Sequence, residues 1–407
     1  YRFSVPNNYM RILSRYILKE FFPPFIIALT CFTVMLIFND LFRLTKLFVQ
    51  KGVSPLYLIE LIFYMMPVMV VLALPMAVLV AILLALGRLS SDNEITAMKS
   101  HGVAFYQLML PLLGVALILS FVNLALMDYA LPQANLAYAS LRRDIQKHNP
   151  AFVLEEATVM KELETEGKLW MYESTNVESG RMQNVKIWDS IWGGRPVFSH
   201  AQEATLAFQD GRAMLTLYDG LSYEPATDNP DEFRITKFQQ QKLSLQMTED
   251  LARGEFQNQT PRSMSLAQLK EFIGTLQATV QTSANPDYTR HKLRFAQVEY
   301  HKKFSIPFAC LALGLIGIPL GLMVKRSGKM IGFGIGLAVI VIYYLLLQAG
   351  QTAGVDDVLS PMVAMWLPNI VIAIFGIALS LWVMGEGKLR AWRDQDRKVS
   401  LIVKAES

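Results

Sequence analysis

The residue types that usually carry catalysis are not spaced for catalysis in this chain. Its five histidines are dispersed, and neither an HExxH zinc motif nor a GxSxG nucleophile motif occurs. The segment Gly321 to Lys329 approaches a phosphate-binding loop, but six residues instead of four separate its glycines, and Met330 replaces the serine or threonine that would hold magnesium. We therefore expect no catalytic residue, no metal site and no cofactor bound by this chain.

Basic residues near the ends of apolar runs are the first candidates for ligand binding. Arg43 and Lys46 follow the first run with i,i+3 spacing, so they would share one face of a continuing helix, and Lys51 lies slightly further along. Similar cations stand near the ends of the third and fourth runs: Arg142, Arg143, Lys302 and Lys303. Such side chains either extend toward lipid headgroups or form the rim of a site for phosphate groups.

A polar segment with an acidic residue separates the second apolar run from the third. It extends from Gly87 to Gly102, and its Ser/Asp-rich start and glycine end predict a short helix across the ends of the membrane helices. Two interpretations stay open. The helix is a solvated connector in which Glu94 is an ordinary surface acid, or it is a docking element for a partner protein.

Six apolar runs must position these residues. The chain has 407 residues, of which 53% are hydrophobic and only 18% charged, outside the usual balance of a soluble protein. Each run approaches or exceeds the roughly 20 residues that cross a bilayer as a helix. The runs are Phe21–Phe38, Leu61–Leu86, Val103–Met127, Phe304–Val324, Ile331–Ala349 and Leu359–Met384.

The segment before the first run is basic and amphipathic. Tyr9 to Phe22 mixes cations with apolar residues at near-helical spacing and is followed by Pro23-Pro24, which predicts an interfacial elbow helix that ends there. The chain starts with Tyr1 rather than methionine, so we expect its natural start to lie further upstream.

The distribution of cations predicts the orientation in the membrane. Basic residues flank the apolar runs on one side, which the positive-inside rule places in the cytoplasm with both chain termini. They are Arg11, Arg15, Lys19, Arg88, Lys99, Lys325, Arg326, Lys329, Lys388, Arg390, Arg393 and Arg397. Arg43, Lys46 and Lys51 fall on the other side, an exception that a functional role would explain. The net charge of +4 is too small and scattered to indicate a nucleic-acid partner.

The middle of the chain reads as an antiparallel β-sandwich or jelly roll outside the cytoplasm. Short alternating runs predict its strands: Leu169–Tyr172, Val185–Trp188, Thr205–Phe208, Met214–Tyr218 and Lys242–Leu245. Turn signals separate them at 178–180, 193–194, 210–211 and Asp219-Gly220. A capping box then opens a helix from Ser265 to Val280.

We expect four parts in this chain. The first is an interfacial helix with three membrane helices in residues 1–130, and the second is the β-jelly roll with connecting helices in 131–300. Three further membrane helices occupy 301–387, and a cytoplasmic tail occupies 388–407.

These features together resemble the LptF/LptG (YjgP/YjgQ) permeases over nearly the whole chain. The loop from Arg88 to Gly102 (RLSSDNEITAMKSHG) is the most specific element. Leu131 to Asn135 (LPQAN) and Gly317 to Gly321 (GIPLG) are also similar to the family, as is the order of three helices, a β-domain and three helices.

The resemblance implies the permease subunit of an ABC transporter that extracts lipopolysaccharide from the inner membrane and passes it to a periplasmic bridge for delivery to the outer membrane. A dimeric LptB-type ATPase would bind the ATP and magnesium. Other implied partners are a homologous LptF/LptG subunit and periplasmic jelly-roll proteins similar to LptC and LptA. The helix from Ser90 to His101 would contact the ATPase through Asp92, Glu94, Met98 and Lys99. Lipid A carries phosphates, so the rim of cations named above would bind lipopolysaccharide.

Two other classes are alternatives. An ion-coupled lipid transporter ordinarily places ionisable groups near the membrane midplane, and the six apolar runs contain none. A membrane-anchored periplasmic assembly factor would use the helices only as a tether, for which six long spans are more than is needed.

Overall fold

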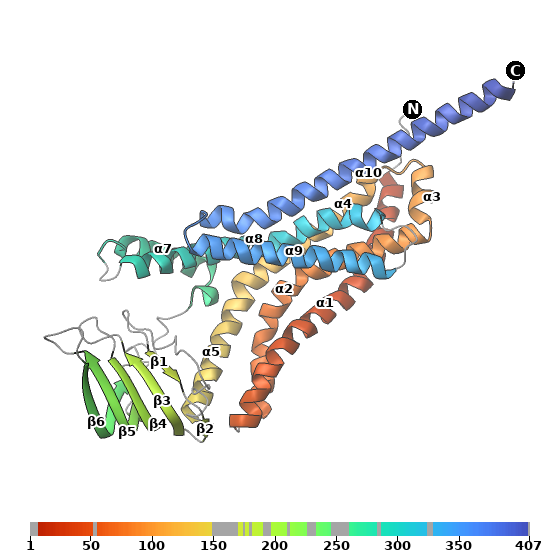
Figure 1. Cartoon of the computed structure of the whole chain (residues 1–407). Coiled ribbons are helices and arrows are strands. Elements are labelled where there is room, and N and C mark those ends of the chain that lie inside the picture. Colours follow the sequence, from red (N-terminus) through yellow and green to blue (C-terminus); the bar gives the residue numbers. More distant parts are fainter. Residues whose placement is uncertain are drawn as a thin grey trace.

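The chain forms a bundle of long helices with an antiparallel sheet beside one end of it (Figure 1). The computed structural model describes residues 7–51, 55–148, 170–173, 176–178, 181–189, 197–209, 212–225, 233–245, 260–282, 286–323 and 329–405. Its longer helices are α1 (Asn7–Lys51), α2 (Pro55–Ser91), α4 (Phe105–Ala125), α5 (Leu131–His148), α8 (Pro286–Met323), α9 (Lys329–Val355) and α10 (Pro361–Ala405). The shorter ones are α3 (Glu94–Ser100), α7 (Leu266–Thr279), a π-helix at Leu126–Ala130 and a 3-10 helix at Pro261–Ser263.

Six helical segments in the described residues are long and apolar enough to cross a membrane, and α2 and α8 form the centre of the bundle. In their most apolar windows 78% and 72% of the residues are buried, against 28–33% in the other four spans. Gly314, Gly317 and Gly321 line the α8 face that packs on α2, where an added Cβ would lie only 2.9 Å from the Leu79 side chain at Gly317. Small residues let membrane helices approach closely, and here they place two helices at the core.

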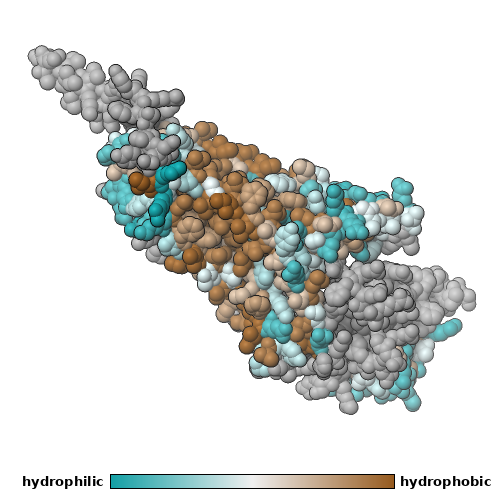
Figure 2. All heavy atoms as spheres, turned by 180° about the vertical axis from the view of Figure 1, so that it is seen from behind, coloured by the Kyte–Doolittle hydropathy of each residue, from teal (hydrophilic) through white to brown (hydrophobic). Residues whose placement is uncertain are grey.

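The outer surface of the bundle is apolar where a membrane would surround it. Figure 2 shows a hydrophobic band with hydrophilic surface at both ends of it. Large apolar side chains are exposed on the outer helices, among them Ile27 on α1, Phe121 on α4, Ile342 on α9 and Trp382 on α10. So large an exposed apolar surface is unfavourable in water and matches the hydrocarbon core of a bilayer. The predicted six-span membrane protein with an inserted antiparallel β-domain is confirmed.

The first helix differs from the prediction at its two prolines. The interfacial helix does not end at Pro23-Pro24, because α1 is one helix from Asn7 to Lys51 with both prolines inside it. Proline removes backbone donors, but membrane helices tolerate it where surrounding structure compensates. Packing holds the segment in place, since Ile17 and Phe21 are completely buried.

Side chains from two neighbouring helices donate hydrogen bonds to backbone carbonyls of α2 near its second proline. Pro75 has no N–H for the carbonyl of Val71, four residues earlier. The amide of Asn123 on α4 donates to that carbonyl at 3.2 Å, and the hydroxyl of Tyr344 on α9 donates to the adjacent carbonyl of Leu72 at 2.7 Å. These contacts tie three spans together where the backbone of α2 would otherwise lack a partner in a dry environment.

The contact between α9 and α10 depends on a glycine. We expect Gly350→Ala to lower the stability of the folded helices by about 1–3 kcal/mol, because the new Cβ would overlap the backbone carbonyl oxygen of Ala364. The matched control is Gly114→Ala on α4, where nothing lies within 4 Å of an added Cβ. Alanine favours a helix over glycine by about 1 kcal/mol, so the control is expected to unfold at an equal or higher temperature in detergent. Equal unfolding temperatures for the two variants would contradict the prediction.

The described strands form one antiparallel sheet. They are β1 (Trp170–Glu173), β2 (Asn176–Glu178), β3 (Arg181–Asp189), β4 (Val197–Gln209), β5 (Arg212–Pro225) and β6 (Phe233–Leu245). The order is β1-β3-β4-β5-β6, with β2 on the remaining length of β3, so β3 to β6 pair in chain order within the described residues. The five runs predicted as strands fall on β1, β3, β4, β5 and β6, with only Leu169 outside the described residues.

One predicted turn is wrong and another three lie wholly or partly outside the described residues. Asp219 and Gly220 lie inside β5, and the sheet pairing continues on both sides of them. Asp219 adopts a left-handed φ of 47°, which aspartate tolerates better than most residues. Gly220 leaves room for the ring of Phe238 on β6 and for the His200 carbonyl, so the glycine allows close packing between neighbouring strands instead of forming a turn.

The chain returns from the sheet to the membrane through α7 and α8. The predicted capping box is confirmed, because the Ser265 backbone N–H donates to Gln268 at 2.9 Å and the Gln268 N–H donates to the Ser265 hydroxyl at 3.3 Å. The helix α8 starts at Pro286 and continues past residue 301, and α10 continues past residue 388. The expected domain limits at 301 and 388 therefore lie inside continuous helices.

Candidate functional site

The polar segment between α2 and α4 folds into a sharp corner with a short helix at its tip. The helix is α3, Glu94–Ser100, and not the longer Ser90–His101 helix that we expected, because Ser90 and Ser91 belong to the last turn of α2. Asn93 stands at the break between the two helices with a φ of 59°, and its side chain makes no capping hydrogen bond.

Glycine closes the corner, as predicted. Gly102 has a φ of +86°, its N–H donates to the Lys99 carbonyl at 3.0 Å, and the Val103 N–H donates to the Met98 carbonyl at 3.1 Å. This is the Schellman pattern, in which a left-handed glycine ends a helix. Ile95 is buried against the bundle and anchors the helix from beneath. The corner is therefore a built structure that presents the rest of α3 outward.

Glu94 is oriented by the first helix. The hydroxyl of Tyr16 on α1 donates to its Oε2 at 2.7 Å, and the carboxylate is half-buried. A second contact also joins α1 to this corner. Arg88 of α2 forms an ion pair with Glu20 of α1 at 2.5 Å, and its Nε lies 3.7 Å from the Asp92 carboxylate. Two polar links thus hold the basic start of α1 against the corner. A carboxylate accepts several hydrogen bonds, so Glu94 can still accept one from a cation of a docking partner.

The other residues predicted to contact a partner lie on the same corner. Asp92 and Lys99 are exposed, while Met98 packs partly against the core of the bundle. Sequence reasoning did not predict the contacts of Tyr16, Glu20 or Arg88 at this corner. The signal was the i,i+4 spacing of Tyr16 and Glu20, which puts both on one helix face.

The predicted basic rim is only partly within the described residues. The helix α1 continues to Lys51, so Arg43 and Lys46 lie one turn apart on its backbone, as the spacing required. The side chains of Arg43, Lys46, Lys51 and Arg143 lie outside the described residues. Arg142 is exposed on α5.

Lys302 and Lys303 face inward in this arrangement. The ammonium of Lys302 donates to Glu299 at 3.2 Å and to Gln351 of α9 at 3.1 Å. Lys303 is 2% exposed, and it donates at 3.1 Å to the carbonyl of Met127, which lies in the π-helix. A π-helix shifts carbonyls out of the regular α pattern, and a buried cation can satisfy one of them. These two lysines stabilise contacts between spans in this conformation.

Comparisons with known proteins agree over most of the chain. The family model described as "Lipopolysaccharide export system permease LptF/LptG" matches residues 15–382. The lipopolysaccharide export system permease protein LptF of Escherichia coli K12 is 22% identical over 376 residues, which cover 91% of this chain and 95% of that protein. The LptF protein of Shigella flexneri matches to the same extent. An uncharacterised protein of Rickettsia prowazekii is 22% identical over 215 residues, 53% of this chain and 59% of its own length.

The matched region reaches all six membrane-spanning segments, covering the first and sixth except for a few residues at their outer limits, and includes the corner at α3 and the described sheet. It also includes every segment on which the sequence resemblance rested, since Arg88–Gly102, Leu131–Asn135 and Gly317–Gly321 all lie inside it. The chain therefore belongs to the LptF/LptG family of lipopolysaccharide export permeases, which are membrane transport subunits without an ATPase domain of their own.

Proposed function

We propose that this chain extracts lipopolysaccharide from the inner membrane and passes it toward a periplasmic bridge, driven by a separate cytoplasmic ATPase that docks at α3. The observation that carries the proposal is the separation of two sites along the membrane helices. The corner at α3 lies at the end of the bundle toward which both chain termini point, and the sheet lies beside the other end (Figure 1). A subunit arranged in this way can respond to ATP hydrolysis by a docked ATPase on one side of the membrane and deliver a lipid on the other.

The docking end has the chemistry of a coupling element. Glu94 lies in the first turn of α3 and is oriented by Tyr16, so a cation in a groove of the ATPase would find a positioned carboxylate. The hydrogen bond also connects the docking helix to α1, which continues to Arg43 and Lys46. A displacement of the corner is thereby passed to the helix that carries the predicted lipid contacts. ATP and magnesium belong to the ATPase in this proposal.

The delivery end has the chemistry of an anion site beside an apolar surface. Arg43 and Lys46 lie one turn apart near the end of α1, and this end of the helix is near the level of the sheet in Figure 1. Cations there could pair with lipid A phosphates while the acyl chains stay in hydrocarbon. We propose a homologous LptF/LptG subunit as the second half of the cavity. LptC-like and LptA-like jelly-roll proteins would continue the β-domain, because edge strands can add a further strand. Both chain termini are cytoplasmic in this arrangement.

The test is reconstitution of transport. The chain, its homologous partner and the ATPase are placed together in vesicles loaded with lipopolysaccharide, and lipid transferred to a soluble jelly-roll acceptor is measured with and without ATP. We expect transfer that requires ATP and the ATPase. Transfer driven by an ion gradient without ATP, or failure of the ATPase to associate, would overturn the proposal.

The contact between α1 and α3 yields a separate prediction. Tyr16→Phe removes one hydrogen bond to a carboxylate, a contact that contributes about 1.5–3 kcal/mol, so we expect the affinity for the ATPase to fall roughly tenfold or more. Tyr106→Phe is the matched control, because this tyrosine of the first turn of α4 is 63% exposed. Affinity is measured by titrating labelled ATPase onto each permease complex. The same affinity in both variants would show that Tyr16 does not orient Glu94 for docking.

A further inference from the structure

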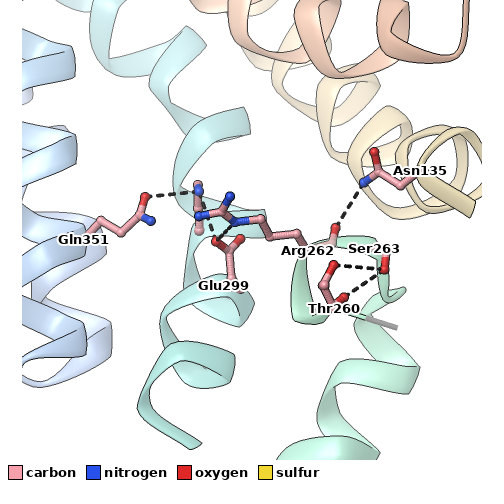
Figure 3. A network of polar contacts seen from close by, with 7 residues as sticks. Asn135, Thr260, Arg262, Ser263, Glu299 and Gln351 are labelled. Atoms are coloured by element: carbon pink, nitrogen blue, oxygen red, sulfur yellow. Dashed lines mark hydrogen bonds and ion pairs between the residues drawn. The ribbon is translucent and has the colours of Figure 1, made fainter. Parts of the chain in front are cut away.

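The two connections between the membrane helices and the sheet meet at one residue (Figure 3). The ingoing connection is α5, which leads from the third span toward the sheet. The outgoing connection is described again from Thr260, and its first helical turn is Pro261–Ser263. The amide of Asn135 on α5 donates to the backbone carbonyl of Arg262 at 3.4 Å. Arg262 thus lies where the ingoing and outgoing connections contact each other.

The side chain of Arg262 contacts α8 directly and is linked to α9 through Glu299 and Lys302. Its Nε donates to the Glu299 carboxylate on α8 at 3.2 Å, and its guanidinium stands 5.4 Å from the centre of the Phe295 ring on the same helix. The Glu299 side chain is only 5% exposed, and its Oε1 also accepts from Lys302 at 3.2 Å. Lys302 continues the network to Gln351 on α9 at 3.1 Å. One buried carboxylate therefore joins the outgoing connection to α8 and α9.

Local structure fixes the backbone around Arg262. Pro261 and Ser263 on either side are buried, and the Ser263 hydroxyl donates to the Thr260 carbonyl at 2.9 Å. A second anchor lies directly downstream, where the Leu266 N–H at the start of α7 donates to the Asp128 carboxylate in the π-helix of the third span at 2.6 Å. The backbone is fixed on both sides of Arg262. Its guanidinium has a buried acid on one side and water on the other.

We propose that Arg262 is a positioning residue. Its contact with Glu299 couples the position of the β-domain to movements of α8 and α9. A buried carboxylate shared by two cations loses stabilisation if either cation leaves, so the outgoing connection must follow α8 when that helix moves. The domain then stays in register with the helices that release lipopolysaccharide. This inference rests on the proposed transport function.

The test separates lipid transfer from ATP hydrolysis in the reconstituted complex of permease subunits and ATPase. We expect Arg262→Gln to leave basal ATP hydrolysis and ATPase binding unchanged and to lower the lipopolysaccharide transferred per ATP by about tenfold, within the usual range of coupling between sites. Arg262→Lys keeps the charge beside Glu299 and is expected to recover most of the transfer. The matched control is Arg290→Gln, because Arg290 is 58% exposed against 60% for Arg262 and its ion pair is with Asp287 of its own helix.

A distance measurement gives the structural half of the test. Spin labels at Gln239→Cys on β6 and Met362→Cys on α10, in a Cys31→Ser background, report the separation of the sheet from the helices. We expect Arg262→Gln to broaden this distance distribution and Arg290→Gln to leave it as in the parent chain. If Arg262→Gln fails to fold, Glu299→Gln removes this charge pair from the α8 side, together with the pair to Lys302, and is expected to lower transfer at least as much.

The outcomes are distinguishable from a failure of the proposed function. If the parent complex shows no ATP-dependent transfer, the transport proposal itself is wrong. If the parent complex transfers lipid and Arg262→Gln transfers as much per ATP as Arg290→Gln, with an unchanged distance distribution, the positioning role of Arg262 is overturned.

Discussion

Replacing Glu94 by alanine is expected to weaken binding of the cytoplasmic ATPase by roughly 100-fold and to stop ATP-driven transfer. Truncating one partner of a charged, hydrogen-bonded pair at an interface costs about 2–5 kcal/mol, and a tenfold change corresponds to about 1.4 kcal/mol. Alanine also removes the acceptor of the Tyr16 hydroxyl, so the link between α3 and α1 disappears together with the charge.

A second substitution separates these two effects. Glu94→Gln keeps an oxygen that can accept from Tyr16 but removes the negative charge, so we expect it to bind the ATPase nearly as weakly as Glu94→Ala if the charge is what the partner recognises. Thr96→Ala is the control on the exposed side of α3. The measurement is the affinity of purified ATPase for each permease complex in detergent. Glu94→Ala and Thr96→Ala with equal affinities would make α3 a solvated connector, the first of the two interpretations that the sequence leaves open.

Reversing the two cations at the far end of α1 is expected to have the second largest effect. In Arg43→Glu/Lys46→Glu, two attractions for lipid A phosphates become two repulsions one helical turn apart. At about 1 kcal/mol for each attraction removed and a similar amount for each repulsion introduced, the change is roughly 3–4 kcal/mol, or several hundred-fold in affinity. We expect stimulation of ATP hydrolysis by lipopolysaccharide to disappear, while basal hydrolysis and ATPase binding stay unchanged.

The control for this variant reverses the same number of charges elsewhere. Arg234→Glu/Lys237→Glu changes two exposed cations on β6 that are also three residues apart. Stimulation is measured against lipopolysaccharide concentration at two salt concentrations, because exposed charge interactions weaken as salt rises. If the α1 variant and the β6 variant respond alike, Arg43 and Lys46 only reach toward lipid headgroups and do not select the substrate.

Local rules predicted the elements of this fold well. The capping box at Ser265 and the glycine stop at Gly102 involve residues three to five apart, so their geometry depends only on a short stretch of sequence. The same rules failed where packing across the sheet or bundle outweighed them. Pro23-Pro24 does not end α1, whose preceding turn is buried through Ile17 and Phe21, and the Asp219-Gly220 pair is not a turn because Phe238 packs on the glycine.

The sequence by itself determined which segments cross the membrane, where the sheet is inserted and which loop carries Glu94, because hydrophobic length and period depend only on neighbouring residues. Only the tertiary structure decided what those residues touch. Tyr16 and Glu94 are 78 positions apart, and Lys303 and the Met127 carbonyl are 176 apart. Such pairs depend on how whole helices pack, and that packing also gives Lys302 and Lys303 contacts between spans and joins Arg262 to Glu299.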